Sequence, residues 1–169
     1  LDKTIFDLAK AGYAVLPLGE YENLDELNYL ASKLDELGES EYEHFQAAME
    51  ISDYTGSLKD LINLTDNLDK YDVFPGLDDY DDLGRYYIDE LGTMQVPEYL
   101  QNYIDYEEYG RDIALEDTGA FTDYGYVYDN QSRFEEYYDG DRENIPEEYR
   151  VMVSPEEVEE LEPDLERLD

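Results

Sequence analysis

Negative charge dominates this amino-acid sequence: 47 aspartates and glutamates stand against 11 lysines and arginines, which gives a net charge of −36 at pH 7. Such a charge opposes compaction, because like charges repel one another in a folded chain. However, 41% of the residues are hydrophobic and 14% are aromatic, most of them tyrosine. Disordered acidic chains are poor in aromatics, so the composition predicts a folded protein whose tyrosine rings pack while their hydroxyl groups stay in water.

The same composition excludes several classes of function. Direct binding to nucleic acid or to an anionic membrane requires basic patches, which this chain lacks. No stretch approaches the ~20 apolar residues of a membrane span. The absence of cysteine rules out disulfides and thiolate metal sites and is typical of a reducing compartment. We therefore expect no bound cofactor, no direct nucleic-acid binding and no membrane binding.

The charge is unevenly distributed, and this predicts the domain organisation. The first 19 residues are neutral overall, so the net charge lies in the rest of the chain. This shift in composition predicts a boundary near Gly19. The expected divisions are an uncharged leader at 1–19, a helical subdomain at 20–69, an α/β subdomain at 70–150 and a disordered acidic tail at 151–169.

Leucines at helical spacing predict three helices in the first half of the chain. The first runs from Asn23 to Leu37, with Asn23 as its cap and Glu26 at the capping-box position. A second runs from Ser40 to about Met49 with a capping box of its own, and Ser57 opens a third. Together these helices predict a small helical bundle.

The second half of the chain predicts a small antiparallel sheet with helices. The expected strands are Tyr71–Phe74, Ile113–Leu115, Ala120–Thr122 and Tyr126–Tyr128. One helix is expected to begin at Asp81 or Asp82 and to end at Leu91. Another opens after Pro97 and continues to about Tyr109. The predicted fold class is therefore α+β, a helical bundle followed by a small antiparallel sheet with helices.

Side chains that could support catalysis are scarce. His44 is the only histidine and stands between Glu43 and Phe45 on a predicted helix, so we interpret it as structural. The sequence has neither a P-loop nor a Rossmann glycine fingerprint, and no pair stands out among its carboxylates for acid–base chemistry. We therefore do not expect an enzyme. Asp78–Asp82 and Asp139–Asp141 are rich in oxygen ligands, but neither matches an EF-hand loop, so they predict at most weak calcium binding.

Charge that is spread over several helices can itself be a function. Duplex DNA carries one negative charge per ~1.7 Å of axis, and proteins that bind it hold lysines and arginines along a groove. Carboxylates on several helices can reach a comparable density and compete for such a groove without presenting base edges. Two alternatives remain: an acidic module that sequesters a basic, histone-like protein, and acidity that serves only solubility.

One string of residue types is not explained by acidity alone. The string is Leu100-Gln-Asn-Tyr-Ile-Asp-Tyr-Glu-Glu-Tyr-Gly-Arg-Asp112, with Leu83–Gly92 before it and Gly119–Asp129 after it. Together these segments resemble the ArdA-type antirestriction proteins. The resemblance extends back more loosely to Asp25, leaves out residues 1–19, and implies that the first domain of the family is missing.

The resemblance implies a DNA mimic that is carried by a mobile genetic element and acts in the cytoplasm of a bacterial host. Proteins of this family occupy the DNA groove of the methyltransferase core in type I restriction–modification enzymes. They are elongated and dimeric. The implied partner is therefore the basic DNA groove of such an enzyme, and a homodimer is expected.

The resemblance also assigns an antirestriction motif, whose members are Leu100, Asn102, Tyr103, Asp105, Tyr106, Glu107, Gly110, Arg111 and Asp112. Its apolar and aromatic members indicate packing in a core or dimer interface, with Gly110 at a turn and Arg111 paired with Asp112. Direct contact with the enzyme is the alternative. We expect the mimicry at other acids: Asp25, Glu26, Asp78, Asp79, Asp81, Asp82, Asp89, Glu90, Glu107 and Glu108.

Overall fold

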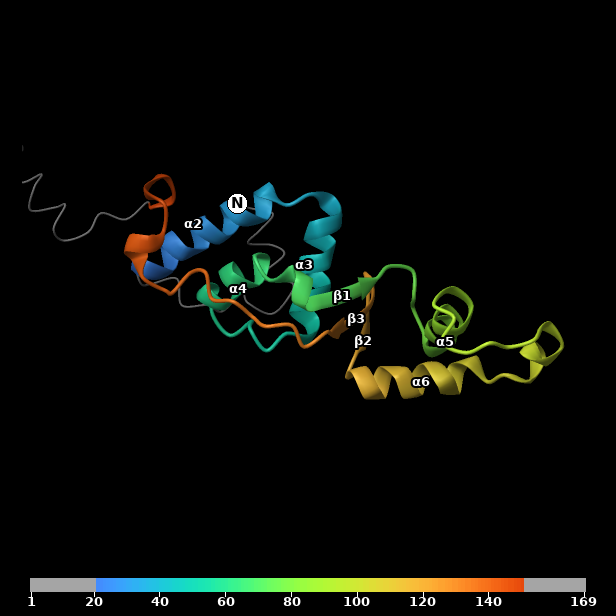
Figure 1. Cartoon of the computed structure of the whole chain (residues 1–169). Helices are drawn as coiled ribbons and strands as arrows, with labels where there is room; N and C mark the ends of the chain where they lie inside the picture. The colour runs from blue at the N-terminus through green and yellow to red at the C-terminus, as the bar shows by residue number, and fades with distance from the viewer. Residues whose placement is uncertain (1–20, 151–169) are drawn as a thin grey trace, which may run out of the picture. The chain divides into compact units, whose positions relative to one another are not determined.

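The computed structural model describes residues 21–150 (Figure 1). The described chain forms two compact units, each assembled from stretches that are distant in sequence. Unit 1 contains the described residues up to Glu36, Ser57–Asn63 and the residues from Glu136 onward, and unit 2 contains Leu37–Gly56 and Leu64–Glu135. This division differs from the expected consecutive subdomains. The expected leader at 1–19 and tail at 151–169 lie outside the described residues.

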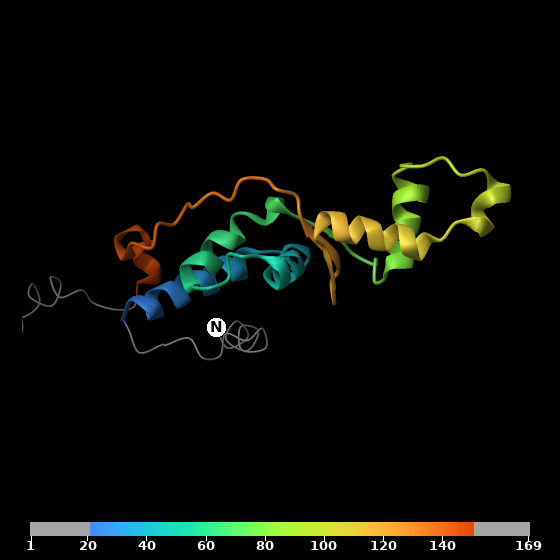
Figure 2. The same cartoon turned by 90° about the horizontal axis from the view of Figure 1, so that it is seen from below.

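Unit 1 is built around helix α2 (Tyr21–Glu36) and most of helix α4 (Leu58–Thr65). Leu27, Leu30 and Leu34 of α2 recur every three or four residues and share one buried face, whereas Leu24 of the expected stripe is exposed. The chain after residue 129, which we call the returning segment, contains two short 3₁₀ helices, Arg142–Asn144 and Glu147–Tyr149, which contact α2 (Figure 2). Because α2 begins at Tyr21, Asn23 lies inside the helix, and its expected capping role is wrong.

Two buried asparagines hold this returning segment by its backbone. The Asn63 side chain donates to the Tyr138 carbonyl and accepts from the Tyr138 amide, both at 2.8 Å, in unit 1. Asn67 makes the same pair of bonds with Glu135 in unit 2, again at 2.8 Å. Each asparagine side chain thus satisfies both backbone groups of one residue, as a paired strand would in a sheet, because the side-chain amide offers both donor and acceptor atoms.

Unit 2 contains helix α3 (Glu39–Ile51) and a three-stranded antiparallel sheet of order β1-β3-β2. The strands are β1 (Tyr71–Phe74), β2 (Ala120–Thr122) and β3 (Gly125–Asp129), with Tyr71 opposite Asp129 and Ala120 opposite Val127. The predicted α+β class and three of the predicted strands are confirmed. The expected strand Ile113–Leu115 is wrong, because these residues lie in helix α6 (Tyr106–Asp117).

Three local predictions in the first half can be compared with the structure. Helix α3 is capped by Gly38 without a side-chain bond, so the capping box expected at Ser40 is wrong. The prediction that Ser57 opens α4 is confirmed, because its hydroxyl accepts from the Asp60 amide at 3.1 Å. The His44 ring nitrogen Nε2 lies 2.5 Å from the Tyr71 carbonyl oxygen, which ties α3 to β1 and agrees with a structural role.

The helices of the second half begin at aspartate caps that the pattern did not identify. Asp79 caps helix α5 (Tyr80–Arg85) by accepting from the Asp82 amide at 2.8 Å, so the cap expected at Asp81 or Asp82 is wrong. A π-helical turn, Tyr86–Glu90, continues α5. The helix expected from Pro97 to Tyr109 is instead a 3₁₀ helix, Glu98–Tyr103, followed by a break and then α6. The break arises because Asp105 caps α6, accepting from the Glu108 amide at 3.0 Å.

The core of unit 2 joins α5 and α6 to the sheet. Leu83, Ile113, Ala114 and Tyr126 are buried together, and Phe74 and Tyr128 are among the rings that pack against them. The Tyr126 hydroxyl donates to an Asp117 carboxylate oxygen at 3.2 Å, and burial raises the pKa of that carboxyl group. None of the helices between residues 21 and 150 is long and apolar enough to cross a membrane.

Candidate functional site

Helices α5 and α6 cross with their backbones in contact, as both views of the molecule show (Figures 1 and 2). A Cβ atom on Gly84 would overlap the carbonyl oxygen of Tyr106, and one on Gly110 would overlap the carbonyl oxygen of Tyr80. Both glycines therefore allow a close approach of two helices. The turn expected at Gly110 is wrong, because this residue lies inside α6 and is buried.

Each of the two helices also places an arginine over a tyrosine of the other. The guanidinium of Arg85 lies 4.2 Å from the centre of the Tyr106 ring, and that of Arg111 lies 5.4 Å from the centre of the Tyr80 ring. Within its own helix, Arg85 binds Asp81 at 2.7 Å, which raises the pKa of the guanidinium. Arg111 lies 3.6 Å from Glu107 and not against Asp112, so the expected pairing of Arg111 with Asp112 is wrong.

Acidic side chains concentrate on this helix pair and its connecting segment. Residues 77–117, which we call the acidic helix pair, contain 13 acids and 2 bases. Eight of the ten candidate acids lie in this segment. Six of them are exposed and two are half-buried. The exposed residues are Asp78, Asp79, Asp89, Glu90, Glu107 and Glu108, and the half-buried residues are Asp81 and Asp82.

The remaining two candidate acids lie in unit 1 and bond to side chains of the returning segment. Asp25 is 0% exposed and forms an ion pair with Arg142 at 2.5 Å. Its expected place on an acidic surface is therefore wrong. Glu26 is half-buried and accepts a hydrogen bond from the Tyr138 hydroxyl at 3.1 Å. Both partners lie more than 100 residues away in sequence, so no local pattern could indicate this burial.

The comparison with protein families decides the identity. The model of the ArdA antirestriction proteins matches residues 5–128, which include the whole acidic helix pair. The chain belongs to the ArdA family of antirestriction proteins. The match begins at residue 5, so the expectation that residues 1–19 lie outside the family is wrong. The comparison with curated proteins found no match.

The residues that the resemblance assigns to an antirestriction motif lie in two different environments. Its second half lies on α6, where Tyr106 and Gly110 are buried. Asp105, Glu107, Glu108 and Arg111 line a hollow of about 300 Å³ at the start of that helix. The first half is on the surface: Leu100, Asn102 and Tyr103 are exposed, Tyr103 to 82%. Packing of Leu100 and Tyr103 in the core of the unit is therefore ruled out. Asp112 is also exposed.

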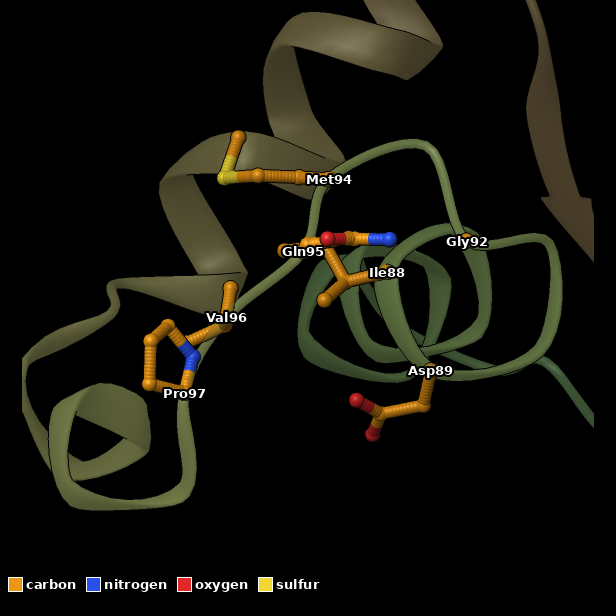
Figure 3. Close-up of a pocket in the computed structure, with 7 residues that line it drawn as sticks. All are labelled: Ile88, Asp89, Gly92, Met94, Gln95, Val96 and Pro97. Carbon is orange, nitrogen blue, oxygen red and sulfur yellow. The ribbon is translucent and has the colours of Figure 1, made fainter.

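The segment that joins α5 to α6 carries little charge and exposes apolar side chains. From Leu91 to Ile104 it has a single ionisable acid or base other than tyrosine, Glu98. The segment lines an open cavity of about 530 Å³ together with Ile88 and Asp89 of the preceding π-helical turn (Figure 3). Asp89 is the only acid or base that lines the cavity, so the lining offers no pair of groups for acid–base chemistry. The exposed apolar side chains are Leu91, Met94, Tyr99, Leu100 and Tyr103.

Three carboxylates of the acidic helix pair approach one another closely enough to be considered as metal ligands. Oxygens of Asp79, Asp81 and Asp82 lie within 4.8 Å of one another. Each of these groups already has a partner within the protein. Asp79 accepts from the Asp82 amide, Asp82 accepts from the Asp78 amide at 3.2 Å, and Asp81 binds Arg85. This arrangement indicates helix capping, and weak calcium binding stays a prediction.

The sequence interpretation missed Tyr80, Gly84 and Arg85 as members of the site. A signal for them exists in the sequence. The string Asp79-Tyr-Asp-Asp-Leu-Gly-Arg85 matches Asp105-Tyr-Glu-Glu-Tyr-Gly-Arg111 in six of seven residue types if aspartate and glutamate are equated. Only a comparison of the motif with its own neighbourhood reveals this repeat, because neither copy differs from its surroundings in composition.

Proposed function

We propose that this protein is a DNA mimic that inhibits type I restriction–modification enzymes in the cytoplasm of a bacterial host. Its membership of an antirestriction family supports an effect on restriction enzymes. The observation that carries the mimicry is the acidic helix pair, in which two crossed helices and their connecting segment carry 13 acids and 2 bases. Like its relatives, the protein would be carried by a mobile genetic element.

In this mechanism the carboxylates occupy the DNA groove of the methyltransferase core and replace the phosphates of the duplex. The lysines and arginines of the groove then release their own counterions, as they do when they bind DNA. Because no base edges are presented, inhibition is independent of the recognition sequence of the enzyme. Attraction between exposed charges is screened by salt, so inhibition weakens steeply as ionic strength rises.

The acids act together, and none of them is individually essential. Those proposed to contact the enzyme are Asp78, Asp79, Asp81, Asp82, Asp89, Glu90, Glu107 and Glu108. Asp79 also caps α5, and Asp81 and Glu107 also pair with arginines of their own helices. The acids to replace in a test of charge are therefore the exposed ones that neither cap a helix nor pair with an arginine.

The test compares two variants that remove the same number of charges. One carries Asp78→Asn, Asp89→Asn, Glu90→Gln and Glu108→Gln on the acidic helix pair. The control carries Glu39→Gln, Glu41→Gln, Glu43→Gln and Asp53→Asn, which are also exposed residues of unit 2. Inhibition of DNA methylation by a type I enzyme is measured at several salt concentrations, together with displacement of a labelled duplex.

We expect the helix-pair variant to inhibit more weakly and to show a shallower dependence of log affinity on log salt, because fewer groove cations are neutralised. The control should stay close to the parent protein. Equal effects of the two variants, or inhibition that does not change with salt, would contradict the proposal. A basic histone-like protein is assayed in parallel, and equally tight binding to it would favour general sequestration of basic proteins.

We also propose that the protein forms a homodimer, in which the exposed apolar side chains between α5 and α6 lie at the interface. Leu100 and Tyr103 belong to this segment, which has little charge to repel a second copy. Sedimentation velocity tests the proposal. Leu100→Glu should shift the protein to monomer, whereas Leu115→Glu, which alters an exposed leucine of α6, should not. A monomeric parent protein would contradict it.

A further inference from the structure

The strings Asp79–Arg85 and Asp105–Arg111 contact one another through equivalent residues. Tyr80 corresponds to Tyr106, Gly84 to Gly110, and Arg85 to Arg111. The glycine of each helix faces the backbone at the tyrosine of the other, and the arginine of each lies over that tyrosine ring. The aspartate that begins each string caps its helix. This is the pattern of an isologous contact, in which residue i meets residue j and j meets i, but it occurs here within one chain.

We propose that the two strings are two copies of one helix-locking motif, and that Arg85 and Arg111 are positioning residues that hold the acids of both helices in place. In this assignment the glycine and arginine of the antirestriction motif contact α5 and not the enzyme. The functional part of the inference rests on the proposed DNA mimicry, whereas the locking part concerns the fold alone.

Helix geometry explains why one string can both lock and display charge. At 3.6 residues per turn, positions four apart share a face, so each tyrosine and its glycine point toward the partner helix. The two acids that follow the tyrosine lie outside this face, whereas the arginine that follows the glycine reaches the tyrosine ring of the other helix. Each arginine can therefore bind an acid four residues earlier, as Arg85 binds Asp81 and Arg111 approaches Glu107. The tyrosine, glycine and arginine that hold the helices together are thus fixed relative to the acids, because all of them lie on the same helical turns.

Because the arginines are positively charged, a charge role and a positioning role predict opposite changes in inhibition when an arginine is replaced. A positive charge weakens attraction to a basic groove. If Arg85 and Arg111 contributed only charge, replacing either by glutamine would strengthen inhibition. If they position the acids, the same replacement weakens inhibition although the chain becomes more acidic.

The experiment measures inhibition of a type I enzyme by Arg85→Gln, Arg111→Gln and the double variant. Arg133→Gln is the matched control, because Arg133 is exposed in unit 2 outside the helix pair and the charge change is identical. We expect each helix variant to inhibit roughly tenfold more weakly, and the double variant little more weakly than either, because both residues hold the same crossing. Arg133→Gln should inhibit as well as the parent or better. Stronger inhibition by Arg85→Gln and Arg111→Gln would overturn the proposal.

Replacements of the two tyrosines distinguish the loss of the arginine–ring contact from a general loss of structure. Tyr80→Phe and Tyr106→Phe keep the ring face that attracts a guanidinium, so both should inhibit like the parent. Tyr80→Leu and Tyr106→Leu remove that face and should behave like the arginine variants. Phenylalanine variants that are as weak as the leucine variants would contradict a role for the ring face.

Amide hydrogen exchange tests the lock without any enzyme. Removing an arginine from one helix should speed exchange in both helices, because each arginine contacts the opposite helix. We therefore expect Arg85→Gln to affect amides after Tyr106, and Arg111→Gln to affect amides after Tyr80. Exchange that changes only in the mutated helix would overturn the lock. If exchange changes in both helices while inhibition is unaltered, the lock stands and the proposed mimicry by these helices fails.

Discussion

Gly84 of α5 and Gly110 of α6 face each other where the two helices cross. A Cβ atom on Gly84 would lie 3.1 Å from the Gly110 amide nitrogen, and one on Gly110 would lie 2.9 Å from the Gly84 amide nitrogen. Either atom would also overlap a tyrosine carbonyl of the other helix. The crossing therefore requires that neither position carries a side chain, although neither helix needs a glycine there by itself.

The first prediction is that Gly84→Ala and Gly110→Ala each destabilise the protein, although alanine favours isolated helices by ~1 kcal/mol over glycine. Each added methyl group would meet backbone atoms that cannot rotate away, so the helices must separate. We expect each change to lower the free energy of unfolding by about 1–3 kcal/mol, as overpacked cores do. Chemical denaturation measures the change.

The control for the glycine variants is Gly38→Ala. Gly38 precedes α3, and a Cβ atom there would meet nothing within 4 Å. We expect its loss of stability to stay below about 1 kcal/mol, since alanine is only a poorer N-cap than glycine. A gain of stability in Gly84→Ala or Gly110→Ala would show that the helices do not pack through these residues.

The second prediction concerns the buried ion pair of unit 1. Asp25→Asn should lower the free energy of unfolding by about 3 kcal/mol, because it removes the buried carboxylate charge that binds the largely buried guanidinium of Arg142. Asp35→Asn, an exposed change on the same helix, should alter it by no more than about 0.5 kcal/mol. Thermal unfolding of the two variants compares a buried and an exposed acid of equal charge. Equal losses would place Asp25 at the surface.

The third prediction is that the protein becomes more stable as the pH falls from 7 toward 4. Burial raises the pKa of Asp117 above its ordinary value of 3.8, and burial together with Asp123 raises the pKa of Glu50 above 4.5. The folded state thus binds these protons more tightly than the unfolded chain does. Their contribution is full below the unfolded pKa and is lost as the pH rises through the folded pKa. Protonation also relieves the repulsion within a chain of charge −36.

Thermal unfolding between pH 4 and pH 7 measures this dependence, with Asp117→Asn as the control. This variant cannot lose a proton at position 117, so its stability should change less with pH. Asp139 acts in the opposite direction, because its hydrogen bonds to Asn144 lower its pKa, and its contribution is lost as the pH falls through that value. A melting temperature that rises steadily with pH would contradict the prediction.

The fourth prediction concerns the end of α6. Thr118 caps this helix in the left-handed region, with φ of 53° and ψ of 39°. A β-branched side chain is unfavourable there, whereas glycine adopts the conformation without strain. Thr118→Gly should therefore raise the free energy of unfolding by about 1 kcal/mol. Thr118→Ala keeps a Cβ atom and should gain less. A loss of stability in Thr118→Gly would contradict the conformation seen here.

The sequence predicted structure well wherever neighbouring residues supply the interactions. The leucine stripe of α2, the Ser57 cap of α4 and the strand Tyr71–Phe74 all follow from spacing or local hydrogen bonding. Prediction failed at Asp105 and Gly110. Asp105 caps a new helix where continuous periodicity predicted an uninterrupted one. Gly110 has the residue type of a helix stop but serves a contact with a helix that begins 30 residues earlier.

In the candidate site, too, features set by neighbouring residues were predicted and features set by distant contacts were not. Eight of the ten acids chosen from the sequence lie on the acidic helix pair, because acids that are dense in sequence remain dense on short helices. The sequence could not show that Asp25 is buried, unlike these acids, because its partner Arg142 comes from a distant part of the chain. The surface position of Tyr103 was equally hidden, because its residue type is as common in cores as on surfaces.

By itself the amino-acid sequence determined the net charge, the α+β class and the family, because these depend on composition, short-range periodicity and a specific string of residues. Only the tertiary structure decided which acids face solvent, that Gly84 and Gly110 meet where α5 and α6 cross, and that Arg85 and Arg111 each lie over a tyrosine of the other helix. The physical reason is that burial and helix–helix contact depend on residues far apart in the chain, and the local spacing of residue types does not predict such contacts.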